Sequence, residues 1–151
     1  MTDAQRAAIV QEAKSWIGTP YRGWSCLKGM GVDCGQLVYG VYRNCGLLPM
    51  VDIPKDYCLL PGVHSSRSIL EDLFLPHFRE ITEAEVRPGD PVLYKTALRV
   101  ATNTPGFAHA VIVIRWPDYV LHCCTAHGDA GKSPFFKLCP RRFLTLRDEF
   151  C

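Results

Sequence analysis

The spacing of apolar residues changes once along the chain, from the period of helices to the runs that are typical of strands. Early apolar residues recur three or four positions apart, whereas residues 92–94, 107–114 and 119–124 form continuous apolar and β-branched runs. Helices that precede an antiparallel sheet indicate an α+β fold with segregated layers. The length of 151 residues suits one compact domain, so we predict a single domain over residues 1–151.

Two helices are predicted before the sheet. Thr2 with Gln5 resembles a capping box, and the apolar spacing that follows it ends at Gly18. A second helix is predicted to begin at Asp33, a good N-cap residue, and to end at Gly46. Between them, the glycine-rich segment without periodicity indicates a loop.

The signals in the rest of the chain are weaker. Ser68 caps a predicted short helix that carries apolar residues up to Phe74. Residues 115–118 connect the two long apolar runs, and a last strand is predicted over residues 135–138.

Composition excludes several classes of function. The formal net charge of +2 is too small to indicate nucleic-acid binding, and no apolar run is long enough to span a membrane. The first residues lack the basic and apolar regions of a secretory signal. We therefore expect a protein that is made in the cytoplasm without a signal peptide.

The eight cysteines favour a reduced protein over a disulfide framework. The apolar composition of 48% lets the chain build a core without crosslinks, and several cysteines occupy helix-face or strand positions of small hydrophobic residues. We expect most of them to be reduced and buried, and leave open a surface pairing of Cys151.

Cys34 is the candidate nucleophile. It lies in the first turn of a predicted helix, where free backbone N–H groups and the helix dipole favour a thiolate, although the neighbouring Asp33 opposes this. Cys34 also lies on the apolar stripe of the helix, so a purely structural role in the core is the alternative.

A nucleophilic cysteine needs a base and a group that orients the base. His109 lies in an apolar strand and His122 in the following one. An even loop around Trp116-Pro117 pairs Ile114 with Tyr119 and places both histidines on one sheet face as diagonal neighbours. We expect this face to point toward the start of the helix at Cys34 and to carry Val111, Val113 and Val120, and the other face to carry Ala110, Ile112 and Leu121. An odd loop would place them on opposite faces, and His127 is the alternative third residue.

A structural zinc site is a further possibility, since several potential ligands are close in sequence. Adjacent cysteines on a strand point to opposite faces, and the chain has no Cys-x-x-Cys pair, so this possibility is disfavoured. The ligands considered are His122, Cys123, Cys124, His127 and Cys139.

Four sequence blocks, in this order, resemble the NlpC family of papain-like cysteine peptidases. The first joins residues 18–22 (GTPYR) to residues 32–35 (VDCG) through a glycine-containing loop. The others are the P-G-D-hydrophobic block at residues 87–93, the His-containing block at 108–113 and the segment Val120-Leu121-His122.

The resemblance implies a papain-like fold with helices packed on an antiparallel sheet, and it implies neither a cofactor nor a metal. In the family's pattern Cys34 attacks the peptide carbonyl, His109 exchanges the proton and His122 orients His109. Three residues are placed at the substrate: Tyr21, Asp33 and Gly35.

The function implied is a peptidoglycan endopeptidase that cleaves stem peptides between D-glutamate and a diamino acid. Gly23-Trp24-Ser25 and Gly35 depart from the family's usual W-G-G and Ser. The sequence looks most like phage-encoded members, which implies partners in a tail tip or baseplate and action on the bacterial wall from the virion. The alternatives are a structural tail component with little activity and a thiol acyltransferase or deamidase effector.

Overall fold

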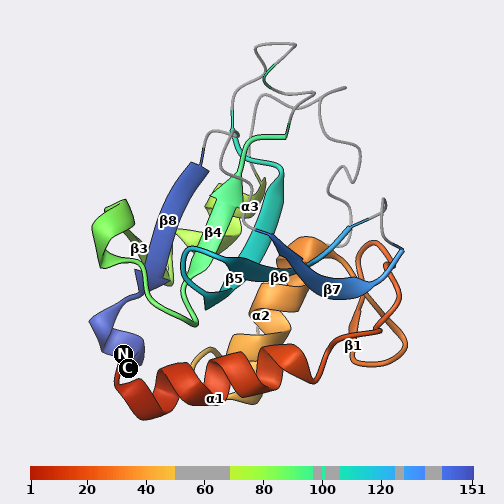
Figure 1. Ribbon diagram of the computed structural model, residues 1–151, viewed down its shortest axis with the longest axis horizontal. Coiled ribbons are helices and arrows are strands. Elements are labelled where there is room, and N and C mark those ends of the chain that lie inside the picture. Colours follow the sequence, from red (N-terminus) through yellow and green to blue (C-terminus); the bar gives the residue numbers. More distant parts are fainter. Residues whose placement is uncertain (50–68, 97–99, 101–105, 125–127, 135–140) are drawn as a thin grey trace.

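Three helices lie on one side of a six-stranded antiparallel sheet (Figure 1). The computed structural model describes residues 1–49, 69–96, 100, 106–124, 128–134 and 141–151. The helices are α1 (Asp3–Lys14), α2 (Cys34–Asn44) and α3 (Ile69–Phe74), with 3-10 turns at Glu83–Glu85 and Asp148–Phe150. The strands are β1 (Cys26–Leu27), β2 (Gly31–Val32), β3 (Phe78–Ile81), β4 (Pro91–Tyr94), β5 (His109–Arg115), β6 (Tyr119–Cys123), β7 (Ala130–Pro134) and β8 (Arg141–Leu146).

The predicted helices are confirmed, with one difference in length. Thr2 and Gln5 form the capping box of α1, and Asp33 caps α2. The first helix ends at Lys14 and not just before Gly18, and Trp16, in the turn that follows, is buried in the core. The short helix α3 is confirmed, while its predicted cap, residue 68, lies outside the described residues.

The sheet has the order β3-β8-β4-β5-β6-β7, with every neighbouring pair antiparallel. Strands β4, β5 and β6 match the apolar runs in the sequence. Strands β3, β7 and β8 were not predicted, and the strand expected over 135–138 lies outside the described residues. The helix layer and antiparallel sheet confirm the α+β class.

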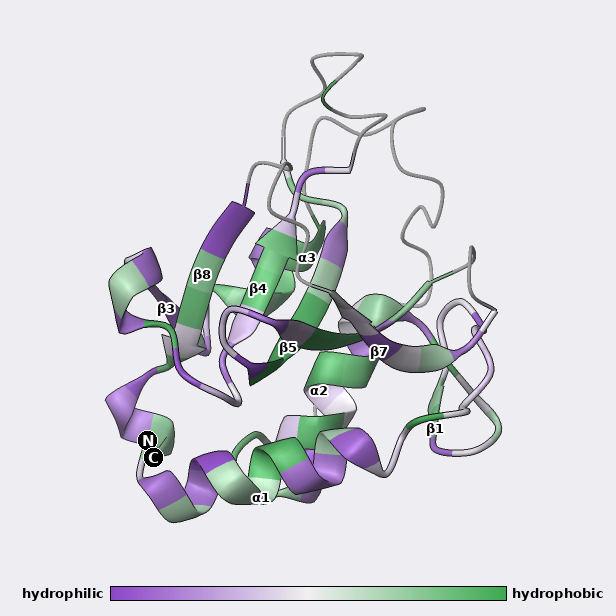
Figure 2. Ribbon diagram, in the orientation of Figure 1, coloured by the Kyte–Doolittle hydropathy of each residue, from purple (hydrophilic) through white to green (hydrophobic). Residues whose placement is uncertain are grey.

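The two faces of the sheet carry different cores. Ala110, Ile112 and Leu121 pack with the helices in the larger cluster. Figure 2 shows hydrophobic residues in green along β4, β5 and α2. Val111, Val113 and Val120, the alternate residues of the same strands, belong to a smaller cluster. This alternation confirms the predicted division of the two faces.

The β5–β6 hairpin has the predicted register beside His122, but its connection differs from the predicted even loop. Ile112 pairs with Leu121 and Val113 with Val120, so His122 lies opposite Val111. Tyr119, however, pairs with Arg115, which makes the predicted Ile114–Tyr119 pairing wrong. Residues 116–118 form an odd connection, and a bulge between Val113 and Arg115 supplies the residue that offsets it.

The segment from Gly18 to Val32 is held at both of its ends. Gly18 N–H donates to Ala130 O at 2.9 Å, and Tyr21 N–H donates to Gly128 O at 2.7 Å, which ties the start of the segment to β7. Val32 N–H donates to Pro20 O at 2.9 Å, so the end of the segment returns beside its start. These bonds fix the chain immediately before Cys34.

Candidate active site

Asp33 positions both the nucleophile helix and the loop before it. Its carboxylate accepts hydrogen bonds from Gln36 N–H and from Trp24 N–H, each at 2.9 Å. The residue is buried, and the two bonds compensate part of the cost of burying its charge. Trp24 has a left-handed backbone (φ 57°), which costs an L-residue about 1–2 kcal/mol and which its bond to Asp33 helps to hold.

Cys34 is the first residue of α2 and is half-buried. Burial, followed by the negative charge of Asp33, raises the pKa of the Cys34 thiol to about 12. Backbone hydrogen bonds from Ala110, Gly35 and Cys34 itself favour the thiolate but do not offset these effects. The thiolate expected from the helix position alone is therefore not the resting form, and the neutral thiol needs a base.

His109 and His122 form a hydrogen-bonded pair. The distance between His109 Nε2 and His122 Nδ1 is 2.8 Å, and the two rings meet edge to face with centroids 5.0 Å apart. His109 is half-buried, whereas His122 is only 2% exposed. The pairing leaves His109 Nδ1 as the ring nitrogen that can take a proton from a nucleophile.

The histidines lie on the sheet face opposite the one on which α2 packs, because they alternate with Ala110 and Leu121. The sequence predicts that their face points toward the start of α2. Instead, the first residue of α2 reaches β5 at the backbone amide of Ala110, which bonds the Cys34 sulfur. The thiol thus meets the strand at the residue next to His109.

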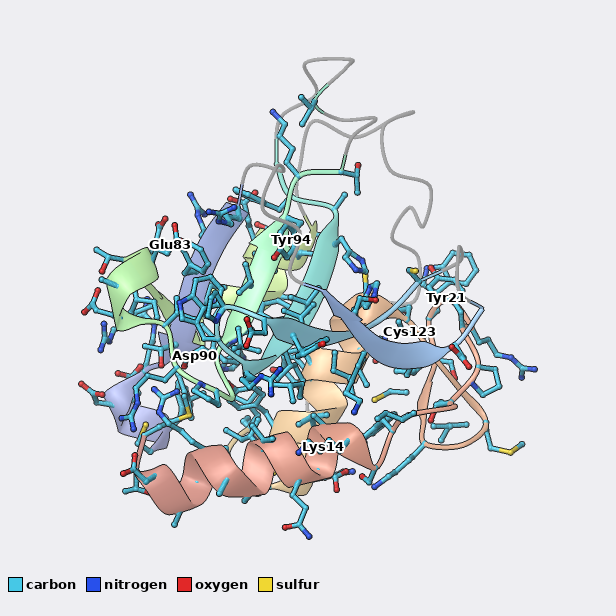
Figure 3. All side chains as sticks on the ribbon, viewed as in Figure 1. Lys14, Tyr21, Glu83, Asp90, Tyr94 and Cys123 are labelled. Atoms are coloured by element: carbon cyan, nitrogen blue, oxygen red, sulfur yellow. The ribbon has the colours of Figure 1, made fainter. Side chains whose placement is uncertain are left out.

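Tyr21 lies beside the candidate nucleophile. Burial, followed by the charge that Cys34 carries once it is a thiolate and by the charge of Asp33, raises the pKa of the Tyr21 phenol. The phenol is therefore neutral at physiological pH and able to donate a hydrogen bond. Cys123 also contributes to this shift, and Figure 3 shows Tyr21 and Cys123 on the same side of the molecule, by the β1–β2 hairpin.

Gly35 is buried in the first turn of α2. A Cβ atom at this position would lie 2.9 Å from Leu70 Cδ2, so the end of the buried Leu70 side chain would have to shift. Glycine therefore lets α3 pack directly on the turn that carries the nucleophile. This contact gives a physical reason for the absence of the serine that the resembling family usually has here.

The six cysteines in the described part of the chain are free, as predicted for most of the eight. The expectation that most are buried is wrong: Cys123 is buried, Cys151 is exposed and the other four are half-buried. Cys123 Sγ donates to Val32 O at 3.4 Å, beside the end of the loop that precedes Cys34.

The zinc alternative gains no support from the described residues, where no three His, Cys, Asp or Glu side chains converge as a metal site. His127 and Cys139 lie outside the described residues, so the alternative third residue stays a prediction. In the same described part, none of the helices is both long and apolar enough to span a membrane.

Comparison with solved structures decides the fold. NlpC1 from Trichomonas vaginalis superposes with a TM-score of 0.68 and 14% identity, over 97% of this chain and 45% of that protein. The NlpC/p60 domain of the peptidoglycan hydrolase SagA superposes with a TM-score of 0.60 and 19% identity, over 94% and 98% of the two chains. The chain has the NlpC/p60 fold.

Another protein with the NlpC/p60 fold shows that the fold does not by itself determine catalysis. RipD from Mycobacterium tuberculosis, described as a non-catalytic NlpC/p60 domain protein adapted to peptidoglycan binding, superposes with a TM-score of 0.58 and 13% identity, over 95% of this chain and 97% of that one. No family model and no curated protein sequence matches the chain. The function therefore depends on the residues of the site and not on the fold alone.

Proposed function

We propose that the protein is a cysteine peptidase that cleaves peptidoglycan stem peptides. The observation that carries the proposal is the 2.8 Å contact between His109 and His122. His109 is adjacent in sequence to Ala110, whose backbone amide bonds the Cys34 sulfur. A thiol, a base and a group that orients the base are the parts that nucleophilic acyl chemistry requires. The NlpC/p60 fold, shared with the hydrolase SagA, supports the wall peptide as substrate.

The chemistry begins with a neutral thiol, because the pKa of Cys34 is raised to about 12. His109 Nδ1 takes the proton as the sulfur attacks the scissile carbonyl and forms a tetrahedral oxyanion. His109 then gives the proton to the departing amine as the carbon–nitrogen bond breaks and leaves a thioester. A water molecule, deprotonated by His109, hydrolyses the thioester and restores the thiol.

Two backbone N–H groups at the start of α2 are the proposed donors to the oxyanion. Asp33 occupies the Gln36 N–H group, whereas the N–H groups of Cys34 and Gly35 face the sulfur. Donors that are fixed before the reaction stabilise charge that develops only in the transition state.

The cleaved bond that we propose lies between D-glutamate and a diamino acid, following the resemblance to NlpC peptidases. Tyr21 would donate its phenol proton to the substrate near Cys34. Asp33 and Gly35 are proposed at the same subsite, where their backbone can contact the peptide while the Asp33 carboxylate holds the loop.

The biological setting is proposed on the same resemblance. We infer a phage-encoded enzyme that is carried on a tail tip or baseplate and acts on the bacterial wall. The alternatives are a structural tail component with little activity and a protein-modifying acyltransferase or deamidase. RipD shows that a protein with this fold can be non-catalytic.

Digestion of purified peptidoglycan separates cleavage from binding. The wild type and Cys34→Ala would each be incubated with intact sacculi, and soluble peptides and sedimented protein would be measured. We expect both to sediment with the wall and only the wild type to release peptides. Binding by both proteins without release would replace the peptidase proposal with a RipD-like binding function.

A further inference from the structure

Ser133 continues the hydrogen-bonded chain that starts at His109. The distance between His122 Nε2 and Ser133 Oγ is 2.7 Å, and Ser133 is 6% exposed. In the β6–β7 register Ser133 pairs with Val120, so its side chain lies on the same face as that of His122. Gly131 is the residue directly opposite His122, so no side chain there competes for the ring.

We propose that Ser133 is a positioning residue that sets the tautomer of His122. This inference rests on the proposed function, in which His109 accepts the Cys34 proton at Nδ1. His109 must then carry its own hydrogen on Nε2 and donate it to His122 Nδ1. That bond requires a lone pair on His122 Nδ1, so the hydrogen of His122 resides on Nε2 and is donated to Ser133 Oγ.

A neutral histidine in the third position needs a partner that holds it in one tautomer, and the Ser133 hydroxyl can be that partner. A carboxylate in the third position can only accept, whereas a histidine can present either a donor or an acceptor to the base. If the hydrogen of His122 were on Nδ1, it would face the hydrogen on His109 Nε2. His109 would then have to carry its hydrogen on Nδ1 instead, and that nitrogen could no longer accept the Cys34 proton. The Ser133 hydroxyl can donate as well as accept, and we propose that it turns its own hydrogen away from the ring and accepts from His122 Nε2–H. It then stabilises the productive arrangement in a place where water cannot substitute freely, since both side chains are buried.

The test removes and restores the hydroxyl. Ser133→Ala should reduce kcat about 10- to 100-fold, with a smaller change in KM. The range is that for metal-bound histidines that lose the hydrogen-bond partner of their other ring nitrogen. Ser133→Thr keeps the oxygen and should recover most of kcat. The matched control is Thr145→Ala, which removes another buried strand hydroxyl with 6% exposure, bonded to Asp90 at 2.7 Å and outside the proposed site.

A spectroscopic readout keeps the proposal testable even if no substrate is cleaved. Long-range proton–nitrogen NMR spectra report the tautomer of each histidine, and His122→Gln identifies the His122 signals. We expect the Nε2–H form in the wild type and Ser133→Thr, and a mixture or the Nδ1–H form in Ser133→Ala. An unchanged tautomer in Ser133→Ala, or equal kcat losses in the Ala and Thr variants, would overturn the role of Ser133. Inactivity of all variants with the expected tautomers would count only against the peptidase function.

Discussion

His109 Nε2 lies 2.8 Å from His122 Nδ1, and this contact exists because a bulge in β5 offsets an odd connection to β6. Without the extra residue, all side chains of β6 would change faces, and His122 would point into the helix-side core. The site therefore depends on a local irregularity of the hairpin as much as on the identities of its residues.

The first prediction concerns the three proposed catalytic residues. Cys34→Ala and His109→Ala should each lower kcat by at least about 10⁴-fold, because nucleophile and base act as one unit. His122→Ala should lower kcat less than either of these changes and leave measurable activity, since an orienting group is less essential than the base. Steady-state hydrolysis of a stem peptide measures all three. Complete loss in His127→Ala together with full activity in His122→Ala would show that His127 is the third residue.

The second prediction is the pH dependence of Cys34 alkylation. The pKa of Cys34 is raised to about 12, so the reactive thiolate is scarce at neutral pH and increases as the pH rises. Iodoacetamide labelling of Cys34, followed by peptide mapping, should accelerate continuously from pH 7 to pH 11. The exposed Cys151 in the same sample provides the internal comparison. A rate that is already constant between pH 6 and 8 would instead indicate a preformed thiolate–imidazolium pair.

The third prediction separates the charge of Asp33 from its shape. Asp33→Asn removes the negative charge that raises the Cys34 pKa, so alkylation of Cys34 at pH 8 should become faster. The amide group can still accept from Gln36 N–H but cannot also accept from Trp24 N–H, which should lower the free energy of unfolding by about 1–3 kcal/mol.

The control for this variant is Asp118→Asn, which removes an exposed carboxylate that pairs with Arg115. It should change neither the alkylation of Cys34 nor, by more than about 0.5 kcal/mol, the stability measured by urea unfolding. Slower alkylation in Asp33→Asn than in the wild type would refute the electrostatic role given to Asp33.

The fourth prediction tests the contact between Gly35 and α3. Gly35→Ser introduces the serine that the NlpC family usually has at this position. It should lower the free energy of unfolding by about 1–3 kcal/mol, because its Cβ would meet Leu70 Cδ2. In a Leu70→Ala background the same change should cost much less. A double-mutant cycle in urea measures the difference, and simple additivity of the two changes would exclude the proposed clash.

Much of the fold follows from local signals in the sequence. The capping box of Thr2 and the N-cap of Asp33 identify α1 and α2, and the β-branched runs identify β5 and β6. These signals succeed because each element satisfies its own end groups or buries one continuous apolar face.

The parts that were missed depend on contacts distant in sequence. Strand β7 contains Gly131 and Pro134 and has no apolar run, so only its pairing with β6 makes it a strand. Ser133 was missed for the same reason, since nothing local distinguishes it from a loop serine. The raised pKa of Cys34 likewise reflects burial against β5, whereas the helix position alone favours the thiolate.

Hydrolysis of a defined stem peptide in ¹⁸O-labelled water shows whether the protein is a peptidase that uses Cys34. The substrate would be a tetrapeptide with L-alanine, γ-linked D-glutamate, a diamino acid and D-alanine, and the products would be identified by mass spectrometry. If the proposed thiol mechanism is correct, the wild type forms an alanyl-glutamate dipeptide with one ¹⁸O in its new carboxyl group, and Cys34→Ala forms none. An intact tetrapeptide after prolonged incubation with the folded wild type, or equal cleavage by Cys34→Ala, would contradict it.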